Sequence, residues 1–213
     1  MIGQLAADFT GSYYDQIPRG LFNIGGAGLN GWRTTCGVAY AGALVLKLVT
    51  NTSNVVDEYL AWFERTPFPS NAAHDDYVAA AGTWTLNVSA RPAPADNAPK
   101  SVGKGLLCHA THGRWLEAAG GVDGAWVTEV FAGNAGMAGM DRCSKLVYDA
   151  TYKMAELIND WAAGTVPTPV LDPSVDTCLT SGCHGGAGAY DQAIIGCAPE
   201  INGKMKCDEA CHQ

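Results

Sequence analysis

The C-terminal end of the chain constrains its fold more than any other segment. Five of the eight cysteines lie in the last 36 residues, among several glycines and few apolar side chains. A segment of this composition cannot bury enough apolar surface to form a core of its own. We therefore expect covalent or metal-based links to organise it. The five cysteines are Cys178, Cys183, Cys197, Cys207 and Cys211.

Two short units in this segment share one order of residues, in which a histidine directly follows the second of two cysteines. The first unit reads Cys178-Leu-Thr-Ser-Gly-Cys183-His184, and the second reads Cys207-Asp-Glu-Ala-Cys211-His212. Covalent haem attachment commonly uses C-x-x-C-H, whereas the gaps here are four and three residues long. The histidine next to the second cysteine must reach the iron, so this adjacency is the constrained part of the motif. The loop before it can be longer.

This pattern predicts two c-type haems per chain. Thioethers would form at Cys178 and Cys183 for one haem and at Cys207 and Cys211 for the other. His184 and His212 would be the proximal iron ligands. Haem of this type is attached after export, so we expect the protein to be periplasmic or extracellular.

Two other interpretations of the same cysteines stay open at this point. Cysteine spacings of this size also suit a tetrahedral zinc site, which would staple the segment. Disulfides in an oxidising compartment are the third possibility, since the number of cysteines is even. Zinc does not require a histidine directly after a cysteine in both units, and disulfides require no histidine at all.

A sixth ligand to each haem iron would come from the remaining histidines. The candidates are His74, His109 and His112. In a helix, His109 and His112 are three residues apart and could lie on one face. His109 stands beside a cysteine in a largely apolar helix, which favours ligation. His74 precedes two aspartates and suits a solvated surface equally well.

Composition excludes several classes of partner. Of the 213 residues, 47% are hydrophobic and 16% are charged, and the net charge is −8. An acidic surface of this kind argues against nucleic acids and anionic membranes as partners. The sequence contains no apolar run of the length, about 18 residues, that a membrane span needs. The first residues lack the basic and apolar regions of a signal peptide, so export would require a signal absent from this chain.

Hydrophobic periodicity predicts a mostly α-helical fold, with a helical core domain over 1–165 and a C-terminal dihaem-attachment segment over 166–213. The longest predicted helix carries Leu146, Val147, Ala150, Met154, Leu157 and Trp161 at intervals of three or four residues. A proline-rich stretch with one short strand is expected over 82–101. The predicted helices span 36–49, 52–66, 72–82, 102–120 and 139–164.

Gly26-Ala-Gly28-Leu-Asn-Gly31 matches the spacing of a dinucleotide-binding loop. Such a loop needs a preceding strand and a βαβ unit, and neither is indicated here. We therefore interpret this stretch as a backbone turn.

Four stretches between about residues 25 and 160 carry a resemblance to a known family. They are "GAGLNGWRTTCGVAYAGALVLKLV", "VVDEYLAWFERTPFPS", "KSVGKGLLCHATHGRW" and "DRCSKLVYDATYKMAELIND". In this order they resemble split-Soret cytochrome c, a group related to the C-GCAxxG-C-C proteins. The "LLCH…RW" and "RCSKL" segments are the most specific.

The resemblance implies a helical homodimer with two closely stacked c-type haems per chain. It also implies an iron–sulfur centre, for which Cys36, Cys108 and Cys143 match three core cysteines of the family. The family has a further cysteine upstream of the glycine-rich turn, which this chain lacks. The centre would then take Cys197 as its fourth ligand, take a ligand other than cysteine, or be absent.

Together these observations favour an electron carrier with bis-histidine haems, exchanging electrons with redox partner proteins by outer-sphere transfer. Such a protein has no catalytic residues and is not an enzyme. The alternatives are a haem enzyme that reduces a small molecule at an open iron site and a zinc-stapled structural protein.

Overall fold

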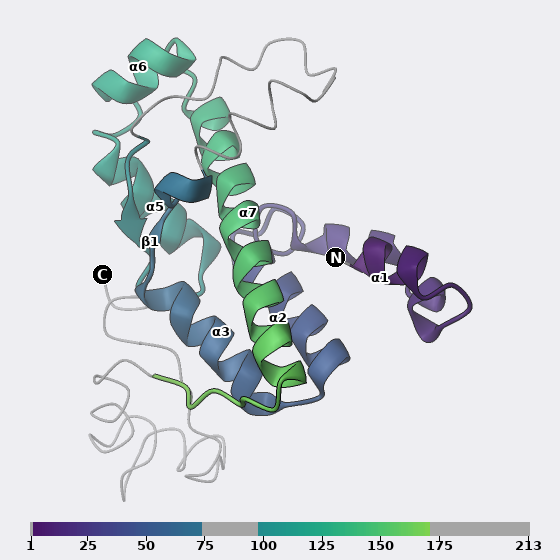
Figure 1. The fold of residues 1–213 in the computed structure, drawn as a ribbon. Coiled ribbons are helices and arrows are strands. Elements are labelled where there is room, and N and C mark those ends of the chain that lie inside the picture. Colours follow the sequence, from purple (N-terminus) through teal and green to yellow (C-terminus); the bar gives the residue numbers. More distant parts are fainter. Residues whose placement is uncertain (1, 74–97, 171–213) are drawn as a thin grey trace, which may run out of the picture.

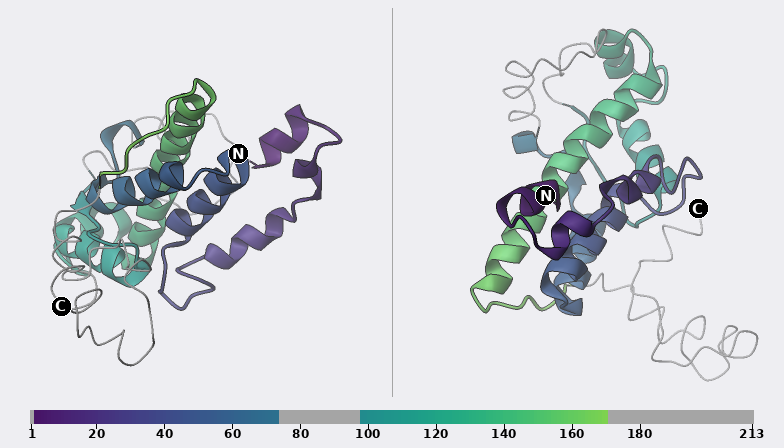
Figure 2. Two further views of the ribbon diagram at one scale, coloured as in Figure 1. Left: turned by 90° about the horizontal axis from the view of Figure 1, so that it is seen from below. Right: turned by 90° about the vertical axis from the view of Figure 1, so that its right-hand side faces the viewer.

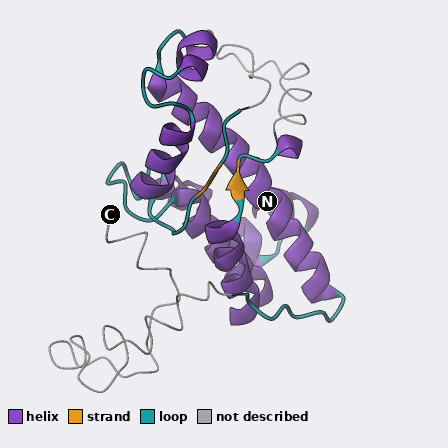
Figure 3. Ribbon diagram, turned by 90° about the vertical axis from the view of Figure 1, so that its left-hand side faces the viewer, coloured by secondary structure: helices purple, strands orange, loops and turns teal. Residues whose placement is uncertain are grey.

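The computed structural model describes residues 2–73 and 98–170 and shows a mostly helical protein, as predicted (Figure 1 and Figure 3). Both Cys-Cys-His units, Cys197 and His74 lie outside the described residues. The same holds for most of the helix predicted over 72–82 and of the stretch over 82–101. No described helix is long and apolar enough to cross a membrane.

One long helix, α7, packs against α2, α3 and α6. The chain order is α1 (Ile2–Asp8), the 3₁₀ helices η1 (Tyr13–Gln16) and η2 (Arg19–Gly25), α2 (Gly37–Thr50), α3 (Ser53–Arg65), α5 (Cys108–Ala118), α6 (Ala125–Phe131) and α7 (Ala135–Ala162). Two short strands, β1 (Pro67–Phe68) and β2 (Ser101–Val102), pair antiparallel, with Pro67 opposite Val102. The N-terminal arm with α1 projects from the helices, as the two views in Figure 2 show.

The C-terminal half of α7 forms the main core with α2 and α3. Leu146, Ala150, Met154 and Leu157 are buried as predicted, but Val147 is 50% exposed. Val147 differs because it faces an open groove between α2 and α7. The helix starts at Ala135, four residues earlier than expected, because the Asn134 side chain caps it by accepting the Met137 N–H at 3.1 Å. It ends before Gly164, whose φ is +84°.

The helix predicted over 102–120 begins only at Cys108. Val102 belongs to β2, and Lys104 has a φ of +52°, which an α-helix does not accommodate. Strand β1 and helix α6 were not predicted, since each is too short for a periodic pattern to show. The N-terminal residues 2–31, for which the sequence predicts no helix, contain one short helix and two 3₁₀ helices.

Hydrogen bonds fasten both sides of the undescribed stretch 74–97 to the helical core. Before it, Ser70 donates its N–H and hydroxyl to the Asp149 carboxylate on α7, at 2.9 and 2.5 Å. After it, the buried Trp115 of α5 donates its indole N–H to the Pro99 carbonyl at 2.8 Å. Lys100 also donates to the Asn71 side chain, so the two flanks of this stretch lie together.

Helices α2 and α3 approach closely at Gly42. The Tyr59 ring of α3 is fully buried against this glycine, and its hydroxyl donates to the Val38 carbonyl at 2.9 Å. A Cβ atom at position 42 would overlap the tyrosine ring and its hydroxyl. The absence of a side chain at Gly42 therefore sets the distance between the two helices.

We expect Gly42→Ala to lower the free energy of unfolding by about 1–3 kcal/mol, because the buried tyrosine has no room to shift. The matched control is Gly113→Ala within α5, where an added Cβ meets no atom within 4 Å. That control should be neutral or stabilise by up to about 1 kcal/mol, through helix propensity. Chemical denaturation of the three proteins measures both effects, and equal stability of the two variants would contradict the packing argument.

Candidate functional site

A short antiparallel backbone pairing brings the starts of α2 and α5 together. Cys36 donates its N–H to the Leu106 carbonyl at 2.7 Å, and Cys108 donates to the Thr34 carbonyl at 2.5 Å. His109 donates to the Arg33 carbonyl at 3.1 Å. Cys36 directly precedes the first residue of α2, and Cys108 is the first residue of α5. The two cysteines are therefore placed by backbone hydrogen bonds between residues that are 70 or more positions apart in the sequence.

The glycine-rich turn before Cys36 shapes this pairing. An added Cβ at Gly28 would lie 2.6 Å from the Cys108 Cβ atom, so this position must stay small for the turn to reach α5. Among the described residues before the turn, 2–25, the structure has helices and no strand, as the interpretation as a backbone turn requires. Positive φ angles occur at Ala27, Gly28, Leu29, Asn30, Gly31 and Arg33.

Two of the three core cysteines are buried in one cluster. Cys36 and Cys108 are 6% and 8% exposed and pack with Phe63, Phe68 and Leu146. Cys143 lies on α7 and is exposed. All three are free thiols. Cys108 is close enough to both Cys36 and Cys143 for the charge of one thiolate to affect the pKa of the next.

Two arginines stand beside these thiols. Arg33 lies near enough to the Cys108 thiol for its guanidinium to oppose the rise in the thiol's pKa. Arg142 is only 3% exposed and donates from Nη2 to the Thr111 carbonyl at 3.3 Å. Its Nε–H has no hydrogen-bond partner among the described residues. A buried guanidinium with an unused donor, next to thiols, favours a negatively charged group at this place.

Burial has the largest effect on the pKa values of Cys36 and Cys108. It raises the pKa of Cys36, whereas the backbone amides of Ala39 and Val38 and the Arg142 guanidinium act in the opposite direction. Burial also raises the pKa of Cys108, with Cys143 adding to the effect and both arginines opposing it. Without a bound cation, both buried cysteines are therefore protonated at neutral pH.

The two described histidines do not converge. His109 is exposed, and its Nδ1 lies 3.2 Å from the Arg33 carbonyl oxygen. His112 is half-buried, packs against Trp115 at a ring-centroid distance of 5.9 Å, and has its Nε2 next to Gly139 of α7. Burial, together with Arg142 and Arg33, lowers the pKa of His112, so this ring is neutral at pH 7.

The described cysteines and histidines do not form a complete metal site. Within residues 2–73 and 98–170, no three side chains of His, Cys, Asp or Glu stand in an arrangement that could hold a metal ion. The other predicted site residues lie outside these ranges. Sequence reasoning missed both arginines, although Arg142 could have been noticed as a charged residue directly before Cys143 in a helix with a buried face.

We expect the three core thiols of the reduced, metal-free chain to react with iodoacetamide at very different rates. Cys143 should react first, and Cys36 and Cys108 about tenfold or more slowly, because they are buried and protonated. Peptide mapping after timed alkylation at pH 7 separates them, with the urea-unfolded chain as a control in which the rates converge. Equal rates in the folded chain would show that Cys36 and Cys108 are accessible.

We compared the sequence and the fold of this chain with those of known proteins. No protein-family model matches the chain. Split-Soret cytochrome c from Desulfovibrio desulfuricans is 26% identical over 204 residues, which cover 92% of this chain. The chain spans 63% of the length of that relative.

A solved structure of split-Soret cytochrome c from Desulfovibrio desulfuricans, described as containing a novel iron centre, has a similar fold. The TM-score is 0.65 and the identity is 23%, and the match covers 100% of this chain and 76% of that one. The two comparisons confirm the resemblance that the sequence indicates: this chain is similar to split-Soret cytochrome c, in sequence over most of its length and in its helical fold.

Proposed function

We propose that this protein is an exported dihaem c-type cytochrome that carries electrons. The observation that carries the proposal is the repeated Cys-Cys-His unit in a chain similar to a c-type cytochrome. This similarity favours haem over a zinc staple or disulfides for the same cysteines. Haem supplies an iron that changes charge by one electron while its ligands stay in place.

The residues of the chain would attach and orient each haem. Cys178 with Cys183, and Cys207 with Cys211, form the thioethers, and the histidine that follows each pair ligates the iron. With a distal histidine as well, each iron has no open position for a substrate. Electrons then pass by outer-sphere transfer, and close stacking of the haems shortens the distance between them.

His109 is the best-supported distal ligand among the described residues. With the proton on Nδ1, the ring donates to the Arg33 carbonyl, which fixes its orientation and leaves the Nε2 lone pair free. Its exposure allows a haem of the same chain or of a second subunit to reach it. The half-buried ring of His112 is the less accessible alternative, and His74 lies outside the described residues.

A second candidate site is an iron–sulfur centre on Cys36, Cys108, Cys143 and Cys197. The neighbouring thiols and the unused donor of buried Arg142 support it, because thiolate-bound iron is negatively charged. The relative is described as having a novel iron centre. The described thiols alone do not complete a metal site, so the proposal requires ligands from the rest of the chain.

The homodimer is supported by an apolar face on α2 and α7. A groove of about 270 Å³ runs between these helices and is lined by Val38, Ala41, Val45, Val147 and Met154 among others. Several large apolar side chains of α2 and α7 are exposed, which is typical of a surface covered by a partner. They are Leu44, Leu48, Met140, Val147 and Tyr152.

The experiment uses the full chain, purified from a host that can mature c-type cytochromes. We expect two covalent haems per chain and a divided Soret band. Cys183→Ser and Cys211→Ser should each leave one haem, because each removes one attachment unit. Cys143→Ser, which lies outside both units, should keep two. Haem content by pyridine haemochrome and the absorption spectrum give the result.

Other outcomes of this measurement discriminate between the alternatives. A colourless protein that binds zinc would overturn the proposal, and a high-spin, five-coordinate iron would favour a small-molecule reductase. Iron in excess of haem, with acid-labile sulfide, would support the second metal centre. The molar mass by light scattering tests the dimer.

A further inference from the structure

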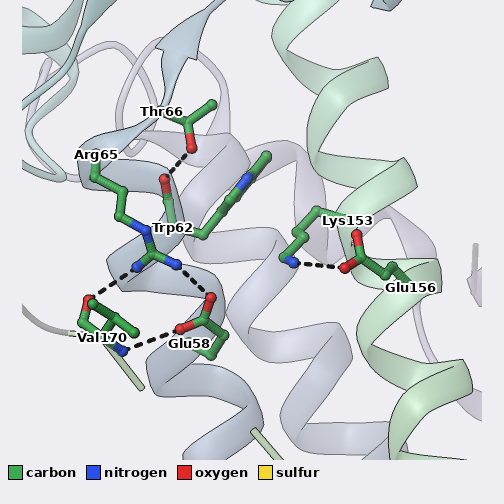
Figure 4. A network of polar contacts seen from close by, with 7 residues as sticks. All are labelled: Glu58, Trp62, Arg65, Thr66, Lys153, Glu156 and Val170. Atoms are coloured by element: carbon green, nitrogen blue, oxygen red, sulfur yellow. Dashed lines mark hydrogen bonds and ion pairs between the residues drawn. The ribbon is translucent and has the colours of Figure 1, made fainter. Parts of the chain in front are cut away.

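Glu58 and Arg65 on α3 hold the backbone of Val170, the last described residue of the chain. Glu58 Oε1 accepts from Arg65 Nη2 at 2.5 Å, and its Oε2 accepts the Val170 N–H at 3.3 Å. Arg65 Nη1 donates to the Val170 carbonyl at 2.9 Å. Figure 4 shows this closed arrangement, in which one ion pair uses both backbone groups of a single residue.

The two side chains are placed for this contact by α3 itself. They are seven residues apart, so they lie two turns apart on one face of the helix. Glu58 is 8% exposed, whereas the Arg65 side chain is 41% exposed. A nearly buried carboxylate needs its hydrogen bonds, and here a guanidinium and a distant backbone N–H supply them.

The segment that reaches Val170 is stiff. Pro167 and Pro169 each have a fixed φ, which restricts the linker that leaves α7. The first cysteine of the haem units, Cys178, follows eight residues after Val170. An extended chain of that length spans at most about 28 Å, so the contact at Val170 limits where the first haem can lie.

We propose that Glu58 and Arg65 are positioning residues that anchor the C-terminal segment against α3. This inference rests on the proposed attachment of haem to that segment. The anchor would limit how far the first haem can lie from the helical core. Without it, the segment would pivot at the end of α7, at Gly164 and Thr165.

The test compares Arg65→Met with a matched control, Lys153→Met. Both changes remove the cation of an ion pair, and both pairs are drawn in Figure 4. The Lys153–Glu156 pair on α7, at 2.9 Å, makes no hydrogen bond to Val170 in the described structure. Arg65→Lys is the conservative variant, which keeps the charge but cannot bridge the carboxylate and the carbonyl as a planar fork does.

The first readout is hydrogen exchange of the linker. Since prolines carry no amide hydrogen, a peptide covering 167–170 reports only on Thr168 and Val170. We expect the Val170 amide to exchange about tenfold or more faster in Arg65→Met, an intermediate rate in Arg65→Lys, and the wild-type rate in Lys153→Met. Equal rates in Arg65→Met and Lys153→Met would overturn the anchor.

The second readout concerns the haems of the matured protein. We expect Arg65→Met to keep two haems per chain but to change the Soret circular dichroism, while Lys153→Met matches the wild type. Unchanged dichroism with faster exchange at Val170 would overturn the positioning role. A wild-type protein without haem would instead contradict the proposed function, and the exchange experiment would still decide whether the anchor exists.

Discussion

The backbone pairing between residues 33–36 and 106–109 is the constraint on which the rest of the arrangement depends. It joins two segments that are distant in sequence and places the starts of α2 and α5 side by side. Its formation requires the glycine-rich turn to adopt several left-handed conformations in succession. Ordering this turn carries an entropic cost, which the buried cluster around Cys36, Cys108, Phe63 and Phe68 offsets.

Helix α7 then connects two regions of different character. Its C-terminal half is apolar where it meets α2 and α3, whereas its N-terminal half buries charged groups. Lys145 is fully buried with Asp141 at 2.7 Å, and Arg142 is buried beside the thiols. Ion pairs of this kind add little net stability compared with apolar side chains. Of these charged groups, Arg142 is the one that acts on the thiols, because its guanidinium opposes the rise in pKa that burial causes at Cys36 and Cys108.

Sequence patterns predicted the parts of the fold that local periodicity controls. The helices over 36–49, 52–66 and 139–164 correspond to α2, α3 and α7 within a few residues at each end. The start of α5 was misplaced because β2 and the left-handed Lys104 depend on pairing with distant residues. Val147 was assigned to the core because its spacing fits the buried stripe, and periodicity does not reveal the groove that leaves it exposed.

The candidate site also has some residues that the sequence predicts and others that only the tertiary structure brings together. The proposed haem-attachment units could be recognised in the sequence because their residues, such as Cys183 and His184, lie close together along the chain. The proximity of Cys36 to Cys108, and of both arginines to the thiols, arises only from tertiary structure. The hold of Glu58 and Arg65 on Val170 is likewise invisible in sequence, because the partners are more than 100 residues apart.

The helical part of the chain and the segment after residue 170 differ in composition, and this difference determines what can hold each of them together. The helical part has enough apolar side chains to fold around α7, and its described residues form three buried clusters. The segment after residue 170 has few apolar side chains, so its order would come from covalent attachment to haem and from contact with the core. A cofactor bound in this way stabilises only the ordered form of the segment, and each tether to the core reduces the entropy lost on binding. If haem is attached as proposed, the proline-containing linker and its contact with α3 would therefore contribute to haem placement.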